Sequence, residues 1–454
     1  MNNAIAVILT LAYIAVVATL VIKKYNSVFV FLMSGIGILL VSAIFTGQSV
    51  LGEETQGNAI IDVFVFAKDA FSSNLGGVGL TLMMITGYAM YMSHIGASTK
   101  LAYLATKPLS KIKNPYIVLS MLFIIGIILK LVITSASGQG MLLMSIAFPI
   151  LISLGISRTS AAAVVVMCSF IDWGPNDSSA VFAAETVCGM PMMDYFFTYQ
   201  AKACLILMVL CAIFLPIYLG RMDKKVQEKA GKAESGHKVE DSNCPAWYAI
   251  LPIIPLALVT IFSFVPDINL DVTSANLLSM AFAFLIELLR KRSKEVPDDL
   301  AFVMKAMGTS YASVVSILIG AAVFAEAIEL LGGISIVSSG LAAIKSAPII
   351  TMTMMSLITF FGAMILGSGN ASWYAFGPLV PDVTAQMGVP IATIALPMQL
   401  ATSIGRSMSP VSGVMIAVSG MAGLEIQDVV KRCTIPVVVM FICNIIVSYI
   451  IVSL

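Results

Sequence analysis

One stretch decides the fold of this chain, and it occurs twice. Its first copy begins with Ser137-Gly138-Gln139-Gly140 and ends with Asp172-Trp173-Gly174-Pro175-Asn176-Asp177-Ser178. Its second copy begins with Ser368-Gly369-Asn370-Ala371 and ends with Gly405-Arg406-Ser407-Met408-Ser409-Pro410. A single numerical shift aligns Ser137 with Ser368, and Gly174 with Gly405. Small and polar residues that interrupt apolar segments at matching places in two halves are typical of a transporter's binding site.

The composition around these copies is that of a membrane protein. Hydrophobic residues make up 59% of the 454 residues and charged residues 11%, with a mean hydropathy of +1.00. Because a soluble domain carries about 25% charged residues, we predict a polytopic membrane protein. The first 20 residues are apolar, but Lys23 and Lys24 follow them rather than precede them. A secretory signal has the opposite order, so we interpret this segment as a retained first helix.

Metal sites and cofactors are not indicated. The seven cysteines form no C-x-x-C pair, and His94 and His237 are the two histidines of the sequence. Structural zinc sites use clusters of these residues, so we expect no metal site of this kind and no cofactor. The cysteines are interpreted as small apolar residues of membrane helices. The net charge of +1 gives no indication of nucleic-acid binding.

Apolar segments of about 20 residues mark membrane-spanning helices. Eight uninterrupted segments qualify, at about 3–22, 27–46, 76–95, 200–220, 246–265, 272–290, 303–331 and 434–453. Two more, 159–190 and 390–421, are long enough but interrupted by the second part of each copy. Two further stretches, about 115–153 and 348–380, break at the repeated Ser-Gly residues and are interpreted as re-entrant hairpins. The predicted fold is an all-α polytopic membrane protein with about ten transmembrane helices plus two re-entrant hairpins.

The distribution of Lys and Arg predicts the orientation. With the N-terminus outside, most of the 25 basic residues fall in cytoplasmic loops, as the positive-inside rule requires. Both termini are then periplasmic, the first hairpin opens to the cytoplasm and the second to the outside. Residues 1–222 and 245–454 form two halves of opposite orientation, which is an inverted repeat. Residues 223–244 are charged and are predicted to form a cytoplasmic linker.

Breaks in membrane helices are expensive, because each unsatisfied backbone group in hydrocarbon costs several kcal/mol. Four of them, at 137–140, 173–178, 368–371 and 404–410, therefore predict a polar cavity between them. The half-helix after each break presents N–H groups that suit an anion. We predict substrate contacts at the tip residues of both hairpins: Ser137, Gly138, Gln139, Ser368, Gly369 and Asn370. The alternative is that each break is a kink with packing glycines.

Arg406 lies inside an apolar segment and is the sharpest candidate for carboxylate binding. A charge at this depth marks a pathway or a partner, and a guanidinium matches a carboxylate with two parallel hydrogen bonds. Ser407 and Ser409 are predicted to add contacts to the substrate. The alternative is a structural ion pair of Arg406 with Asp172, Asp177 or Glu326.

Acids in the first break are the candidates for coupling. Asp172, Asn176 and Asp177 could bind Na⁺ together with backbone carbonyls, and the two Asp residues could carry a proton or meet a substrate ammonium. Lys130, in the first hairpin, could snorkel or pair with an acid, and the sequence assigns it no role.

The sequence resembles the DcuC family of anaerobic C4-dicarboxylate transporters over nearly its whole length. The motifs that carry the resemblance are Ser135-Ala136-Ser137-Gly138-Gln139-Gly140, Gly367-Ser368-Gly369-Asn370-Ala371 and Gly405-Arg406-Ser407-Met408-Ser409-Pro410. The resemblance implies a homodimeric carrier of the bacterial inner membrane that works by an elevator movement. It also implies substrates such as succinate and fumarate. One segment departs from the family pattern: Asp172 and Asp177 make the first break unusually acidic, and they would repel a dianion unless protonated or filled with a cation.

We therefore predict a secondary active transporter of small carboxylates. The resemblance narrows the substrates to C4-dicarboxylates (succinate, fumarate, malate, aspartate), moved by exchange or by coupling to Na⁺ or H⁺. The alternative within the same fold is an amino-acid or monocarboxylate transporter in which Asp172 or Asp177 meets a substrate ammonium or Na⁺. A passive channel fits two oppositely opening hairpins less well than alternating access does. A membrane enzyme is disfavoured, since the sequence shows no recognisable nucleophile and base pair.

Overall fold

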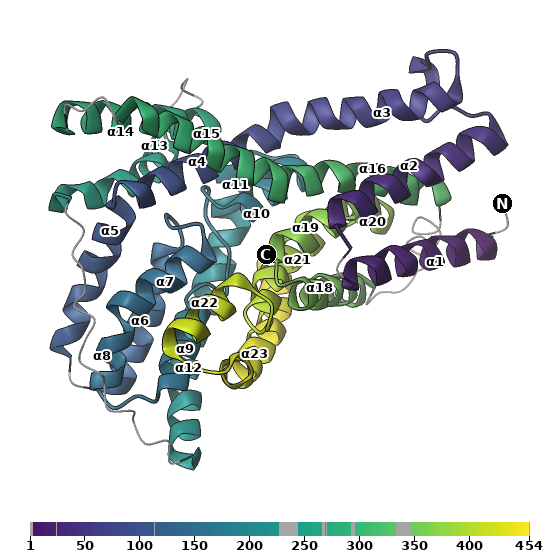
Figure 1. The fold of residues 1–454 in the computed structure, drawn as a ribbon. Helices are drawn as coiled ribbons and strands as arrows, with labels where there is room; N and C mark the ends of the chain where they lie inside the picture. The colour runs from purple at the N-terminus through teal and green to yellow at the C-terminus, as the bar shows by residue number, and fades with distance from the viewer. Residues whose placement is uncertain are drawn as a thin grey trace.

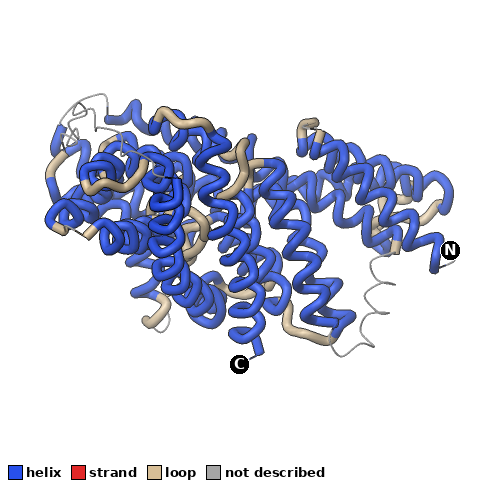
Figure 2. The backbone as a smooth tube through the Cα atoms, turned by 90° about the horizontal axis from the view of Figure 1, so that it is seen from below, coloured by secondary structure: helices blue, strands red, loops and turns tan. Residues whose placement is uncertain are grey.

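A computed structural model describes residues 3–23, 25–112, 114–226, 244–265, 268, 270–291, 296–332 and 347–453. These residues form helices joined by turns, and no strand occurs among them (Figures 1 and 2). The prediction of an all-α polytopic membrane protein is confirmed. Most of the predicted linker 223–244 lies outside the described residues, although helix α12 continues into it as far as Val226.

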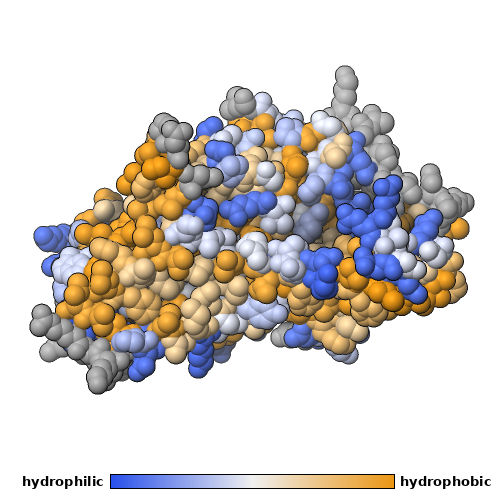
Figure 3. All heavy atoms as spheres, turned by 90° about the horizontal axis from the view of Figure 1, so that it is seen from above, coloured by the Kyte–Doolittle hydropathy of each residue, from blue (hydrophilic) through white to orange (hydrophobic). Residues whose placement is uncertain are grey.

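Seven helices or helical runs of the described chain are long and apolar enough to cross a membrane: Ser27–Thr46, Ala59–His94, Met192–Lys224, Val272–Lys291, Val296–Leu331, Pro348–Leu366 and Ile426–Ser453. Many large apolar side chains on them face outward, and Phe45 is 83% exposed. Figure 3 shows such side chains spread over one face of the molecule. This surface suits lipid rather than water. The predicted count of ten crossings stays a prediction.

One group of helices runs along the top of Figure 1. It contains α2 (Ser27–Thr46), α3 (Ala59–Asn74), α4 (Leu80–His94), α13 (Ile254–Phe262), α14 (Val272–Lys291), α15 (Asp299–Ser310) and α16 (Ser316–Leu331), with α1 (Asn3–Ile22) beside α2. α2 packs along α16, and α4 packs along α15 and α14. These contacts bring helices of the two sequence halves together.

Two helical runs in this group are longer than predicted. α3 joins α4 through a kink in Leu75–Gly79, where Gly77 has non-helical dihedral angles (φ −89°, ψ −120°), and α15 continues into α16 through a π-helical turn at Tyr311–Val315. The predicted segment 76–95 therefore misses α3. The polar residues Asp62, Lys68 and Asp69 lower the hydropathy there, but the helix forms because Asn58 caps it and Asp62 is buried against Thr55 and Gln56.

The first hairpin has its break one turn earlier than predicted. It consists of α6 (Pro115–Leu129), α7 (Ala136–Ile146) and α8 (Phe148–Ser153), and the break covers residues 130–135 instead of 137–140. Ser135 begins α7, because its hydroxyl accepts a hydrogen bond from the Gly138 N–H at 3.1 Å. Helix propensity alone does not favour the Ser-Gly residues that follow, but the cap holds them in the first turns of α7.

The second hairpin breaks at two residues. It consists of α18 (Ala347–Leu366), α19 (Gly369–Phe376) and α20 (Val380–Met387), joined by a short 3₁₀ turn at Gly377–Leu379. Gly367 has φ +72°, which favours glycine, and Ser368 caps α19 by accepting a hydrogen bond from the Ala371 N–H at 3.3 Å. The predicted break 368–371 thus lies largely inside α19.

The two interrupted helices pack against the hairpins. The first consists of α9 (Arg158–Met167) and α10 (Ser178–Val181), separated by residues 168–177, and the second of α21 (Ala392–Arg406) and α22 (Gly413–Ala422). α18 packs along α21, α7 packs against α22, and α19 touches α10. Each hairpin therefore contacts the interrupted helix of the other half, near the breaks.

The remaining helical segments are α5 (Ala97–Thr106), α11 (Met192–Tyr195), α12 (Ala201–Val226), α23 (Ile426–Ser453) and short turns at Gly52–Glu54, Lys107–Lys111, Phe182–Val187, Phe196–Gln200, Ala246–Ile253 and Val296–Asp298.

Candidate functional site

The break at residues 168–177 is buried at the point where both hairpins meet the interrupted helices. Asp172 and Asp177 are 2% and 4% exposed. Side chains of other elements satisfy the break's backbone: the Asp172 N–H donates to Ser403 Oγ at 3.1 Å, and the Gly174 N–H donates to Gln200 Oε1 at 3.0 Å. The break is thus stabilised by protein, as a break in a membrane helix must be.

Arg406, the last residue of α21, binds Asp172 with two parallel contacts. Its Nη1 lies 2.7 Å from Asp172 Oδ2, and its Nη2 lies 3.0 Å from Asp172 Oδ1. Nη2 also donates to the Ser169 carbonyl at 2.8 Å, while Nε has no hydrogen-bond partner among the described residues. Asp172 is therefore the partner of Arg406 in this structure, one of the pairings that the sequence left open.

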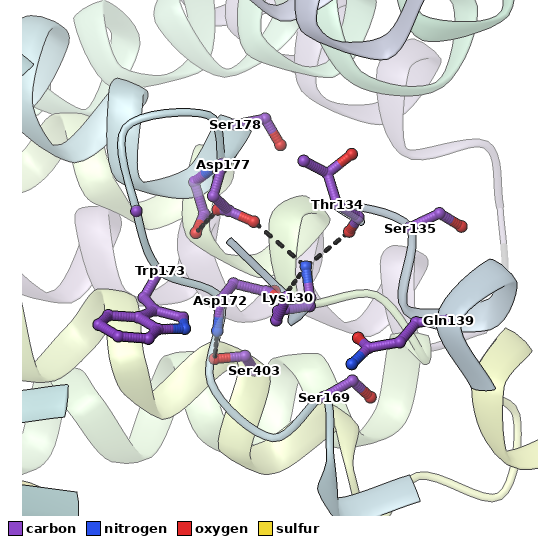
Figure 4. Close-up of polar contacts among 12 residues, drawn as sticks. Lys130, Thr134, Ser135, Gln139, Ser169, Asp172, Trp173, Asp177, Ser178 and Ser403 are labelled. Carbon is purple, nitrogen blue, oxygen red and sulfur yellow. Dashed lines mark hydrogen bonds and ion pairs between the residues drawn. The ribbon is translucent and has the colours of Figure 1, made fainter. Parts of the chain in front are cut away.

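Lys130 joins the same carboxylate from the first hairpin. Its Nζ lies 3.0 Å from Asp172 Oδ1 and 3.4 Å from Asp177 Oδ2, and it donates to the Thr134 carbonyl at 2.6 Å (Figure 4). The side chain is 1% exposed. Sequence reasoning assigned Lys130 no role, although a lone lysine in an apolar hairpin was the signal that could have found it.

We call Lys130, Asp172, Asp177 and Arg406 the charge cluster. Its two cations and two carboxylates cancel in formal charge. Buried ion pairs seldom stabilise a fold more than apolar residues of similar size would, whereas intramembrane charges usually mark a pathway. The composition of the charge cluster therefore favours a functional role over a structural one.

Gln399 holds the two interrupted helices together beside the charge cluster. Its Nε2 donates to the Asp172 carbonyl at 2.9 Å and to Ser179 Oγ at 3.1 Å. Its Oε1 accepts hydrogen bonds from Gln200 Nε2 at 3.0 Å and from the Tyr195 hydroxyl at 3.3 Å. Sequence reasoning missed Gln399, because a glutamine in a long apolar helix gives no indication of what it contacts.

Gln399→Leu is expected to destabilise the protein strongly. The substitution leaves the buried Asp172 carbonyl, Gln200 side-chain N–H and Tyr195 hydroxyl without their partner, and each unsatisfied group costs about 1–3 kcal/mol. Thermal unfolding of the purified protein in detergent should show a melting temperature lowered by several degrees. Gln386→Leu is the matched control, since Gln386 Oε1 has no hydrogen-bond partner among the described residues. Equal melting temperatures for the two variants would contradict the role of Gln399.

The second hairpin reaches the first break through two side chains. Asn370 Nδ2 donates to Ser178 Oγ at 3.1 Å, and Trp373 Nε1 donates to the Ser179 carbonyl at 3.0 Å. In the first hairpin, Gln139 Nε2 donates to the Gly126 carbonyl at 2.5 Å and the Cys168 carbonyl at 3.4 Å. Gln139 Oε1 is buried without a partner among the described residues. The structure thus brings predicted residues of both hairpins to the first break.

Other predicted site residues make local contacts. Ser407 Oγ donates to the Ser403 carbonyl at 3.0 Å, and Ser409 Oγ accepts from the Val411 N–H at 3.3 Å. Asn176 Oδ1 accepts from Asn276 Nδ2 of α14 at 2.9 Å. The remaining predicted residues lie at the hairpin helices' starts, where they cap or pack tightly: Ser137 beside Gly413, Gly138 beside Ser135, Gly369 beside Thr402, and Ser368 as the cap of α19.

Cap residues occupy part of the helix starts that the sequence predicted as anion sites. Ser135, Asp177, Ser368 and Ser412 accept hydrogen bonds at the starts of α7, α10, α19 and α22. The free N–H groups expected there are therefore partly satisfied by the chain itself. Arginine and lysine, rather than these helix starts, are the strongest anion-binding groups at the site.

No group of three His, Cys, Asp or Glu residues in the described part of the chain is arranged to hold a metal ion. The predicted Na⁺ near Asp172 and Asp177 stays a prediction, and in this structure Lys130 and Arg406 contact those carboxylates. An apolar cavity of about 170 Å³ lies elsewhere, between α1 and the second hairpin, where Val17, Phe31, Phe361 and Phe376 are among its lining residues.

Comparison with known proteins gives matches over almost the whole chain. The family model DcuC, described as a C4-dicarboxylate anaerobic carrier, matches residues 1–453. The anaerobic C4-dicarboxylate transporter DcuC of Escherichia coli strain K12 is 33% identical over 429 residues, covering 93% of this chain and 92% of its own. A probable DcuC transporter of Vibrio cholerae is 33% identical over 425 residues, covering 92% and 91%. The solved structure of MtrF from Neisseria gonorrhoeae shares the fold, with a TM-score of 0.63, 15% identity and coverage of 95% and 96%.

Proposed function

The chain belongs to the DcuC family, and from that premise we propose that it is a secondary active transporter of small carboxylates, with C4-dicarboxylates as its substrates. Succinate, fumarate, malate and aspartate are the dicarboxylates we expect it to carry. The protein is a membrane transporter and not an enzyme. Its relatives are named as transporters, and several of its helices are long and apolar enough to cross a membrane.

The contact between Arg406 and Asp172 is the observation that carries this proposal. Asp172 is itself a carboxylate, and Arg406 binds both of its oxygens at 2.7 and 3.0 Å. A substrate carboxylate would bind this guanidinium with the same two hydrogen bonds. The protein thus contains a carboxylate-binding group, deep in its interior, that at present holds one of the protein's own acids.

The two hairpins supply the movement in this proposal. Each ends at a capped break next to the interrupted helix of the other half, and Asn370 and Lys130 reach the same segment from different hairpins. Withdrawal of one hairpin at a time would open the charge cluster to one side at a time, which is alternating access. We propose that an elevator movement carries the cluster across the membrane, in a homodimer of the bacterial inner membrane with both termini periplasmic.

Coupling follows from charge. The charge cluster is neutral, so a bound dianion leaves two negative charges in a medium that disfavours them. Two protons on Asp172 and Asp177, or two Na⁺ ions bound beside them, would restore neutrality. Exchange of one dianion for another would move no net charge in a complete cycle, although the loaded site would still need these protons or cations during each crossing.

A second candidate within the same fold is an amino-acid or monocarboxylate transporter. Asp177 favours it, since its Oδ2 contacts Lys130 at the long distance of 3.4 Å and could meet a substrate ammonium instead. Transport of aspartate would be consistent with both candidate functions, whereas transport of alanine or lactate would support the amino-acid or monocarboxylate transporter alone.

Transport by proteoliposomes tests the proposal. The purified protein is reconstituted, and uptake of labelled succinate, fumarate, aspartate, alanine and lactate is measured with Na⁺ and pH gradients varied separately. We expect saturable uptake or exchange of the C4-dicarboxylates. If none of succinate, fumarate and aspartate moves, the proposed substrate class is wrong.

A further inference from the structure

Lys130 is a buried cation for which the proposed function has no task. It is 1% exposed, and its Nζ contacts Asp172 and Asp177, both from the first break. Arg406, at the end of α21, contacts Asp172 as well. The charge cluster therefore takes its two acids from one segment and its two cations from two other elements.

The two cations are neighbours. Lys130 Nζ and Arg406 Nη2 each lie 3.0 Å from the same atom, Asp172 Oδ1, so they are at most 6.0 Å apart. A short dianion can bring a separate carboxylate to each cation, whereas a monocarboxylate has to share its single carboxylate between them, as Asp172 does in this structure, and leaves half of the positive charge uncompensated. Arg406 Nε lacks a partner among the described residues, so the guanidinium retains an unused donor.

We propose that Lys130 is the second carboxylate-binding residue of the site and sets its preference for dicarboxylates, while Asp172 and Asp177 are internal counterions that occupy the two cations when substrate is absent. This inference rests on the proposed function. On binding, the substrate's carboxylates replace those of Asp172 and Asp177, which then take up the coupling protons or cations.

The position of Lys130 also links this exchange to the hairpin. Its Nζ donates to the Thr134 carbonyl, within the break of the first hairpin, at 2.6 Å. Figure 4 shows the ammonium between Thr134 and the acids. When Lys130 leaves Asp172 and Asp177 for the substrate, either its hydrogen bond to the Thr134 carbonyl breaks or the tip of the first hairpin shifts with it.

A variant that removes a matched pair tests the role of Lys130. Lys130 alone cannot be removed cleanly, because Asp177 would be left as an unpaired buried anion. The double variant Lys130→Met with Asp177→Asn keeps the cluster neutral and the pair of Asp172 with Arg406 intact. The control is Arg432→Met with Asp223→Asn, which removes another pair, with a contact of 2.8 Å, that joins α23 to the end of α12.

The measured quantity is how much better succinate competes for uptake than butyrate does. Uptake of labelled succinate into proteoliposomes is inhibited with unlabelled succinate or with butyrate, a monocarboxylate of the same length. In the wild type and in the control we expect succinate to compete at least about 10-fold better than butyrate, since the second charged contact is worth about that factor or more. In Lys130→Met with Asp177→Asn the two should compete almost equally, with a raised KM for succinate.

Each result decides the question. An unchanged ratio in the double variant, even with slower uptake, assigns Lys130 a structural role and overturns the inference while leaving the proposed function in place. A variant that does not fold is replaced by Lys130→Gln with Asp177→Asn, which removes the same two charges but keeps a polar side chain; loss of the preference supports the inference, and an unchanged preference contradicts it. If the wild type neither takes up nor exchanges succinate, fumarate or aspartate, both proposals are overturned.

Discussion

Arg406→Ala is expected to reduce succinate uptake by proteoliposomes to the level of protein-free vesicles, a fall of at least about 100-fold. The substitution removes both hydrogen bonds that a carboxylate receives at 2.7 and 3.0 Å, and charged hydrogen bonds of this kind are worth about 1.5–3 kcal/mol each. Asp172 keeps Lys130 as a partner, so we expect the variant to remain folded in the membrane.

Two further arginine variants make this measurement specific. Arg406→Lys keeps the charge but loses the planar pair of donors, so it should retain a small part of the uptake. Arg158→Ala removes an arginine that donates to the Ala422 carbonyl, at 2.6 Å and away from the charge cluster, and should retain most of it. Normal uptake by Arg406→Ala would remove Arg406 from the mechanism.

Asp172→Asn is expected to bind succinate more tightly and to transport it more slowly. If Asp172 competes with substrate for Lys130 and Arg406, its neutralisation frees Arg406, leaves Lys130 with the single carboxylate contact to Asp177, and gives the cluster a net positive charge. A competition worth about 1.4 kcal/mol corresponds to a 10-fold lower KM. The maximal rate should fall at least about 10-fold, because release of substrate slows and the empty site no longer neutralises itself.

Asp223→Asn is the control for Asp172→Asn, because it too deprives an arginine of its carboxylate partner. It should leave the KM for succinate unchanged. A higher KM in Asp172→Asn, with a lower rate, would mean that Asp172 supports the site structurally or binds the substrate itself. That result would contradict its role as a counterion that the substrate displaces.

The sequence predicted the membrane fold because apolar length is a physical requirement of the bilayer. The helices α6 to α8 and α18 to α20 begin at or next to the predicted hairpin starts, since Ser-Gly segments stand out in apolar surroundings, but α20 runs to Met387 beyond the predicted end at 380. That these segments are re-entrant stays a prediction. The sequence misplaced the tip of the first hairpin because Ser135, as a cap, overrides the low helix propensity of the residues that follow. It missed α3 because Asp62 is buried by local contacts that a hydropathy profile does not contain.

The site was predicted in parts. Arg406, Asp172 and Asp177 could be selected one by one, since a charge in an apolar segment is conspicuous. The sequence could not predict that Arg406 and Lys130 contact the same oxygen of Asp172. Lys130 lies 42 positions before Asp172 in the sequence, and Arg406 lies 234 positions after it. Gln399 has no charge to attract attention, and its importance follows from four contacts that only the packed structure assembles.

The central claim is that substrate carboxylates bind at the charge cluster. Equilibrium binding of labelled succinate to the purified protein tests it most directly, with the wild type compared to the double variant Arg406→Gln with Asp172→Asn. This variant removes one matched ion pair and leaves Lys130 with Asp177, so its melting temperature should stay within a few degrees. We expect saturable binding by the wild type and an affinity at least about 100-fold weaker in the variant. Binding of succinate with wild-type affinity by the folded variant would contradict the claim.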